Sequence, residues 1–124
     1  MSKKRPLHLA LHLIKLPLPA LVSILHRASG LLLFLFLPLL LTGLQFSLRS
    51  IETYTQLIEI LQSPLSKSLM LVLLWAFLYH FCAGIRYLAI DIGCGVDLAR
   101  ARASSRWVLV LSLGLTILLG TGLW

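Results

Sequence analysis

The sequence predicts an all-α membrane protein, a single domain over residues 1–124 with three transmembrane helices after a short N-terminal lead-in. Of its 124 residues, 59% are hydrophobic and 12% are charged, and the mean hydropathy is +0.96. Ordinary soluble domains are far less apolar than this. A helix of roughly 20 apolar residues crosses the ~30 Å hydrocarbon layer of a bilayer. Three segments reach that length, at about 21–48, 65–92 and 107–123.

The lead-in, residues 1–19, is basic and rich in leucine, and three prolines keep it from forming one long helix. We expect it to lie along the membrane surface or against a soluble partner. His8 and His12 have the i, i+4 spacing of a helical metal pair, although such a pair more often forms part of an interfacial polar face. The segment does not resemble a signal peptide, because histidines and Lys15 break its apolar run.

The first span contains Pro38, which should kink the helix while neighbouring helices satisfy the freed backbone groups. Residues 47–64 form a polar outer loop with a short helix around 51–61. The second span ends at Gly93 and Gly95. The third begins near Trp107, and its glycines suit close helix contact. Two cysteines lie in and just after the second span, and we expect free thiols there.

Charge distribution predicts the orientation. Basic residues cluster before the first span and between the second and third, while the loop between the first two spans is nearly balanced. The positive-inside rule therefore places the N-terminus and the second loop in the cytoplasm. The net charge of +7 does not indicate nucleic-acid binding, because the charges flank apolar spans and form no separate soluble patch.

His80 is the residue that best indicates function, because it lies deep within the second span. An ionisable ring at bilayer depth is costly and usually has a task. Ligation of haem iron is the expected task, and a hydrogen bond across helices is the alternative. Steps of 4, 7 and 11 residues return to one helix face. That face reads Ala76, His80, Gly84, Tyr87 and Asp91.

A second polar cluster lies at the start of the first span. Ser23, Arg27, Gly30 and Phe34 share one stripe, with His26 beside it. A hydroxyl, a guanidinium and an imidazole at the membrane edge suit the polar head of a quinone, whose tail stays in lipid. The alternative is that the arginine only reaches a lipid phosphate.

Haem b in membranes is commonly held by two histidines on facing helices, and only His80 lies at the right depth in this chain. The second ligand should therefore come from another polypeptide. We see no catalytic triad, phosphate loop or soluble active site, and too few polar groups for a transport path.

These clusters resemble the cytochrome b large anchor subunit of succinate dehydrogenase, respiratory complex II, over nearly the whole length. The first motif is Arg5-Pro6-Leu7 followed by SILHRASG over 23–30. The second is YHFCAGIRYLAIDIG over 79–93, which carries an H-x-x-x-G-x-R core and a following aspartate.

The resemblance implies residue roles. His80 is the axial haem b ligand, and Ser23 and Arg27 belong to the quinone site. His26 lies close to a haem propionate, and Arg86 contributes charge near the propionates. Asp91 shapes the cytoplasmic end of the second span.

One position departs from the family pattern. The residue after the motif arginine is commonly histidine or phenylalanine, and here it is Tyr87. A phenol donates a hydrogen bond but carries no positive charge at neutral pH. This puts a propionate role at that position in doubt.

The resemblance also implies an assembly. A flavoprotein subunit oxidises succinate, an iron–sulfur subunit passes the electrons on, and this chain with a second small membrane subunit holds haem b and reduces ubiquinone. Succinate itself does not reach this chain. The expected location is the bacterial inner membrane, crossed several times, with the N-terminus in the cytoplasm. The alternatives are a haem-free structural anchor and the anchor of a fumarate reductase.

Overall fold

The protein is an all-helical membrane protein, described by a computed structural model over residues 15–124. The helices are α1 (Leu18–Ser47), α2 (Ile51–Gln62), α3 (Pro64–Asp91) and α4 (Leu98–Leu123). Three of them, α1, α3 and α4, are long and apolar enough to span a membrane, which confirms the predicted fold class. His8, His12 and the Arg5-Pro6-Leu7 motif lie outside the described residues.

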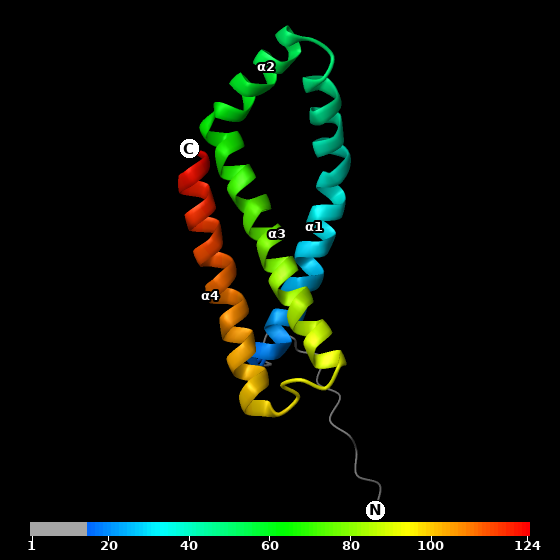
Figure 1. Cartoon of the computed structure of the whole chain (residues 1–124), viewed down its shortest axis with the longest axis vertical. Helices are drawn as coiled ribbons and strands as arrows, with labels where there is room; N and C mark the ends of the chain where they lie inside the picture. Colours follow the sequence, from blue (N-terminus) through cyan, green and yellow to red (C-terminus); the bar gives the residue numbers. More distant parts are fainter. Residues whose placement is uncertain (1–14) are drawn as a thin grey trace, which may run out of the picture.

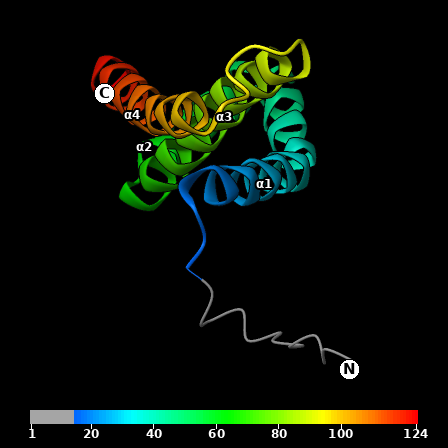
Figure 2. The same cartoon turned by 90° about the horizontal axis from the view of Figure 1, so that it is seen from below.

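The three long helices run alternately up and down, with α3 between α1 and α4 (Figure 1). At one end of the bundle α1 begins, α3 ends and α4 begins, and we call this the basic end. At the other end α2 crosses from α1 to α3, and we call this the α2 end. Figure 2, viewed from below, shows α1 and α4 on different sides of α3.

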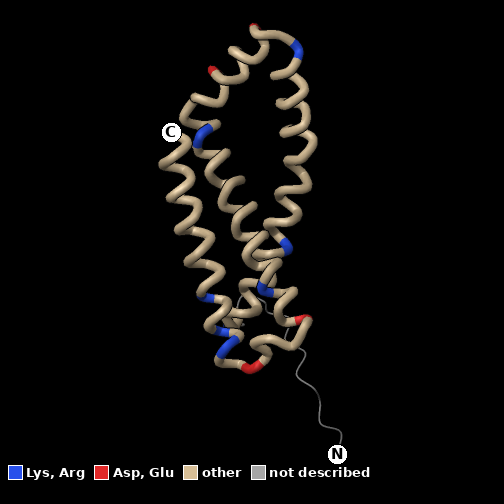
Figure 3. The backbone as a smooth tube through the Cα atoms, viewed as in Figure 1, with Lys and Arg blue, Asp and Glu red and all other residues tan. Residues whose placement is uncertain are grey.

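The two ends of the bundle differ in charge (Figure 3). The basic end carries six basic and two acidic side chains among residues 15–124. They are Lys15, Arg27, Arg86, Arg100, Arg102, Arg106, Asp91 and Asp97. The α2 end is balanced, with two of each sign. The excess of positive charge therefore lies where α1 begins and between α3 and α4.

Local chemistry explains where the first helices begin. Pro17, in extended conformation, precedes α1, and Pro19 lies in the first turn, where a proline costs no intrahelical hydrogen bond. The helix continues through Pro38 to Ser47. Ser50 caps α2, because its hydroxyl accepts from the Thr53 N–H while the Thr53 hydroxyl oxygen accepts from the Ser50 N–H. The expected short helix in the outer loop is thus confirmed.

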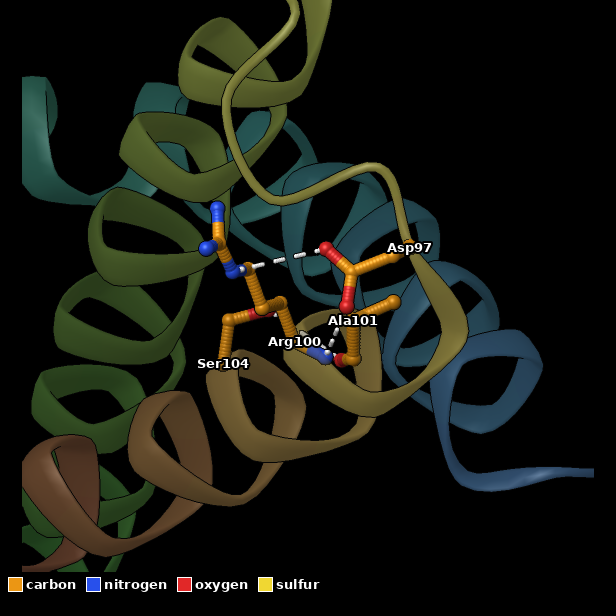
Figure 4. A network of polar contacts seen from close by, with 4 residues as sticks. All are labelled: Asp97, Arg100, Ala101 and Ser104. Atoms are coloured by element: carbon orange, nitrogen blue, oxygen red, sulfur yellow. Dashed lines mark hydrogen bonds and ion pairs between the residues drawn. The ribbon is translucent and has the colours of Figure 1, made fainter.

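The last helix begins earlier than the sequence indicated, at Leu98 rather than near Trp107. Asp97 caps it by accepting a hydrogen bond from the Arg100 N–H at 3.3 Å, and the two side chains form an ion pair at 3.5 Å (Figure 4). Hydropathy alone missed this polar first part of α4. Alanine and arginine, which fill it, are nevertheless strong helix formers. How much of α4 lies within a bilayer stays a prediction.

The core is small and sits at the α1–α3–α4 contact. Its buried members are Val22, Tyr79, Ala83 and Val108. Tyr79 is fully buried, and its hydroxyl donates to the Val22 carbonyl oxygen at 2.8 Å. Most large apolar side chains of the long helices point outward, as a lipid environment requires. The core thus fixes α3 against α1 just beside the functional residues.

Candidate functional site

His80 lies on α3 against the N-terminal half of α1. At Gly30 of α1, a Cβ atom would sit 2.7 Å from Cε1 of the His80 ring and 3.3 Å from its Nδ1. Real Cβ atoms do not approach other atoms so closely, so only glycine leaves room for the imidazole. The half-buried ring is therefore seated on the backbone of α1.

The hydrogen bond of His80 determines which ring nitrogen carries the proton. Its Nδ1 lies 3.0 Å from the His26 carbonyl oxygen. A carbonyl only accepts, so Nδ1 is the donor, and in the neutral ring Nε2 then keeps its lone pair. Metal-binding histidines characteristically donate the other ring N–H to a carbonyl or carboxylate in this way. The α1 backbone thus holds His80 in the tautomer that an iron ligand needs.

Ser29 joins the same contact and is buried, with 6% of its surface exposed. Its hydroxyl donates to the His26 carbonyl oxygen at 2.9 Å, and its Oγ lies 3.2 Å from His80 Nδ1. Three groups from two helices therefore meet at one point. Ser29 is not among the residues predicted from the sequence, although its place one turn after His26 is the spacing at which serine bonds a helix carbonyl.

His26 presents its side chain as well as its carbonyl. Its ring stacks on His80 with centroids 4.2 Å apart and planes 10° apart. Its Nε2 is 3.8 Å from where a Cβ of Gly84 would be, which is an ordinary van der Waals distance, so the ring packs next to Gly84 of α3. The Tyr87 ring follows at 5.2 Å, tilted by 49°. Two predicted residues of different helices, His26 and His80, are thus brought together.

The Tyr87 hydroxyl is the polar atom that this cluster leaves unsatisfied. It is buried and has no hydrogen-bond partner within residues 15–124. Buried hydroxyls are normally paired, so this one is an exception among the described residues, which it shares with Trp75 Nε1. The departure from the family pattern at this position therefore supplies a donor next to the His26–His80 pair.

Arg86 faces α4 rather than the histidines. Its Nε donates to Ser104 Oγ at 2.9 Å and its Nη2 to the Ala101 carbonyl oxygen at 3.3 Å. The residue is 8% exposed, and its guanidinium carbon lies 5.2 Å from the centre of the Tyr87 ring. Guanidinium has five N–H donors, so some remain for another ligand. Its expected role near the propionates stays a prediction.

The two predicted quinone residues, Ser23 and Arg27, lie one turn apart on α1. Ser23 is half-buried and Arg27 is exposed. Within residues 15–124 the observed ion pair is Asp97–Arg100, and Arg27 takes part in none there. Asp91, the last residue of α3, is also exposed at the basic end. These side chains remain free to contact a ligand or another subunit.

No group of three or more potential metal-ligating side chains forms within the described chain. Two apolar cavities of about 460 and 470 Å³ lie at the α2 end, one between α3 and α4 and one between α1, α2 and α3. They are remote from the histidines, so the candidate site is the His26–Ser29–His80 cluster at the α1–α3 contact.

Haem b, the group that the resemblance implies, fits this cluster on chemical grounds. A neutral imidazole with Nδ1–H bound to a carbonyl presents Nε2 as a ligand. Gly30 and Gly84 reduce the bulk around the two rings. The unpaired Tyr87 hydroxyl and the remaining Arg86 donors suit anionic groups beside a ligand. These groups would suit one side of a bound haem.

Alanine at Gly30 should destabilise the protein, because the new Cβ must displace the His80 ring from its carbonyl partner. Overpacking of this kind costs about 1–3 kcal/mol. Gly43 in the same helix is the matched control, because a Cβ there meets nothing within 4 Å. Thermal unfolding of the detergent-purified assembly should show a lower Tm for Gly30→Ala than for Gly43→Ala. Equal values would refute the close approach.

A family model and several curated proteins are similar to this chain. The model of the family described as Succinate dehydrogenase/Fumarate reductase transmembrane subunit matches residues 1–119. A succinate dehydrogenase cytochrome b556 subunit of Coxiella burnetii is 36% identical over 125 residues, covering 100% of both chains. The subunit of that name from Rickettsia felis is 34% identical over 94% of this chain and 90% of its own. That of Paracoccus denitrificans is 31% identical over 92% and 88%.

Proposed function

Because this chain belongs to the succinate dehydrogenase/fumarate reductase transmembrane subunit family, we propose that it holds haem b and forms part of a ubiquinone site. It is a membrane-anchor subunit of succinate dehydrogenase and works within a complex of several subunits. The proposal concerns what the anchor does there. It passes electrons from the iron–sulfur subunit to ubiquinone, together with a second small membrane subunit.

The observation that carries the proposal is the hydrogen bond from His80 Nδ1 to the His26 carbonyl oxygen. It fixes the ring in an orientation and a tautomer suited to iron. His80 would give haem b one ligand from this chain, and the second small membrane subunit would supply the other. His26 and Arg86 lie near enough to His80 and Tyr87 to serve the propionate region.

When bound, haem b supplies a reversible one-electron centre inside the membrane. The protein's own residues orient that centre and tune it. His80 provides the electron pair of Nε2, and the His26 carbonyl holds the opposite nitrogen. The Tyr87 hydroxyl is free to donate a hydrogen bond beside the cluster, so tyrosine retains a polar role at this position.

Ser23 and Arg27 form this chain's part of the quinone site. Arg27 is exposed and forms no ion pair within residues 15–124, so its guanidinium is available to donate to a quinone carbonyl. Both residues lie on α1 at the basic end, where soluble subunits would dock under the positive-inside rule. The proposed location is accordingly the bacterial inner membrane, with the N-terminus in the cytoplasm.

Each partner has a separate task in this proposal. The flavoprotein subunit oxidises succinate, the iron–sulfur subunit conducts the electrons, and the two membrane subunits receive them. This chain therefore carries no residue that acts on succinate. Its contributions are anchoring, half of the haem pocket and part of the quinone pocket.

Purification of the intact complex in mild detergent tests the proposal. The reduced-minus-oxidised visible spectrum should show a b-type haem, and mass spectrometry should identify a flavoprotein, an iron–sulfur protein and a second small membrane protein. A complete complex without pigment would establish a haem-free structural anchor instead. A complex that reduces fumarate with quinol far faster than it oxidises succinate would indicate a fumarate reductase anchor.

A further inference from the structure

We propose that Ser29 is a positioning residue that sets the strength of the hydrogen bond holding His80, and through it the reduction potential of the bound haem. The inference rests on the proposed haem-binding function. Neither the sequence motifs nor the similarity to relatives assigns a role to Ser29. Ser29 contacts neither iron nor quinone in this proposal, and acts only through His26 and His80.

The geometry at the His26 carbonyl carries the argument. This oxygen receives the Ser29 hydroxyl at 2.9 Å and faces His80 Nδ1 at 3.0 Å. It also lies inside α1, where the regular helical pattern directs the N–H of Gly30 toward it. A carbonyl oxygen has two lone pairs. Three donors therefore compete for two acceptor positions, and each bond is weakened by the others.

Serine hydroxyls often bond a carbonyl of the preceding turn, which by itself has no functional meaning. Ser112 in α4 is such a case, fully buried and donating to the Leu109 carbonyl oxygen at 3.1 Å. Ser29 differs, because the carbonyl it occupies is also the partner of an imidazole from another helix. The buried position of Ser29 keeps water from replacing the hydroxyl.

The direction of the effect follows from the competition. The Ser29 oxygen also lies 3.2 Å from Nδ1 and can accept from it, so the Nδ1–H is shared between the hydroxyl and the carbonyl at 3.0 Å. Without the hydroxyl, the His26 carbonyl loses a competing donor and receives the whole Nδ1–H bond of His80. A stronger bond at Nδ1 makes Nε2 a more basic ligand, as outer partners of metal-bound histidines generally do. A more basic ligand stabilises ferric over ferrous iron. Removing the hydroxyl should thus lower the midpoint potential of the haem.

The test is a redox titration of haem b in the purified complex with three variants. Ser29→Ala removes the hydroxyl, and Ser29→Cys replaces it with a thiol, a weaker donor of similar size. Ser112→Ala removes a buried hydroxyl of α4 that donates to a carbonyl of its own helix. We expect the midpoint potential to fall in the order wild type, Ser29→Cys, Ser29→Ala. Ser112→Ala should match wild type.

Each other result overturns the inference. An unchanged potential in Ser29→Ala with full haem content would show that Ser29 has no influence on the ligand. An equal shift in Ser112→Ala would show a general effect of lost hydroxyls. Loss of haem from both Ser29 variants in assembled complexes would make Ser29 a packing residue of the pocket. If the wild-type complex instead lacks haem, the proposed function itself fails, which the wild-type spectrum reveals separately.

Discussion

Replacement of His80 with leucine should abolish the b-type haem spectrum of the complex. The assembled subunits should still oxidise succinate with an artificial soluble acceptor. Leucine has no lone pair, so the iron loses the ligand that the His26 carbonyl holds in place. The measurement is a reduced-minus-oxidised difference spectrum of the purified complex, normalised to flavin content.

Two further variants distinguish loss of the ligand from a disturbed fold. Phe81 follows His80 on α3 and is 58% exposed, so Phe81→Leu should retain the full haem spectrum. His80→Gly should lose it, and added imidazole should restore a low-spin signal by entering the space left beside Gly30. Retention of full low-spin haem in His80→Leu would show that the ligand assignment is wrong.

Replacement of Arg27 with leucine should lower ubiquinone reduction and leave succinate oxidation with the soluble acceptor intact. Arg27 is exposed and without an ion pair within residues 15–124, so its loss breaks few contacts inside this chain. A hydrogen bond to a charged group is worth about 1.5–3 kcal/mol, so its removal should lower kcat/KM for quinone roughly ten- to a hundredfold. Steady-state assays with both acceptors measure the two activities separately.

Arg106→Leu is the matched control for a general loss of positive charge. Arg106 is an exposed arginine at the same end of the bundle, on α4. It should leave quinone reduction close to wild type. An equal decrease of both activities in Arg27→Leu would instead assign that residue to subunit assembly.

Much of the fold follows from the sequence because the bilayer imposes simple rules. Apolar length predicted the three long helices, and α2 was expected from the loop between the first two. The end of α3 was also correct, since Gly93 and Gly95 adopt φ values of 85° and 71° that favour glycine. These features depend on local composition alone.

The beginning of α4 could not be found in the same way. Hydropathy marks where a helix enters lipid, whereas the helix itself starts at its Asp97 cap on the polar side. The two coincide only when the cap lies at the membrane surface. Reading the capping residue as a start signal would have placed the helix correctly.

Two residues of the candidate cluster, His26 and His80, were named from the sequence, whereas Ser29 and the contacts between the helices were not. Helical spacing singled out His80 and placed Gly30 near His26, yet spacing within one helix cannot show which residues of two helices meet. The carbonyl of His26 is a backbone group that any residue would offer, so no side-chain pattern reveals it. The orientation of Arg86 toward Ser104 likewise depends on how α3 and α4 pack.

The most direct measurement is a density map of the assembled complex at a resolution that separates side chains from cofactors. We expect a porphyrin beside α3, with its iron bonded to His80 Nε2 while Nδ1 still donates to the His26 carbonyl oxygen. The opposite axial ligand should be a histidine of another small membrane subunit. A map in which the His80 ring faces lipid or packed helices, with no porphyrin against it, would contradict the account.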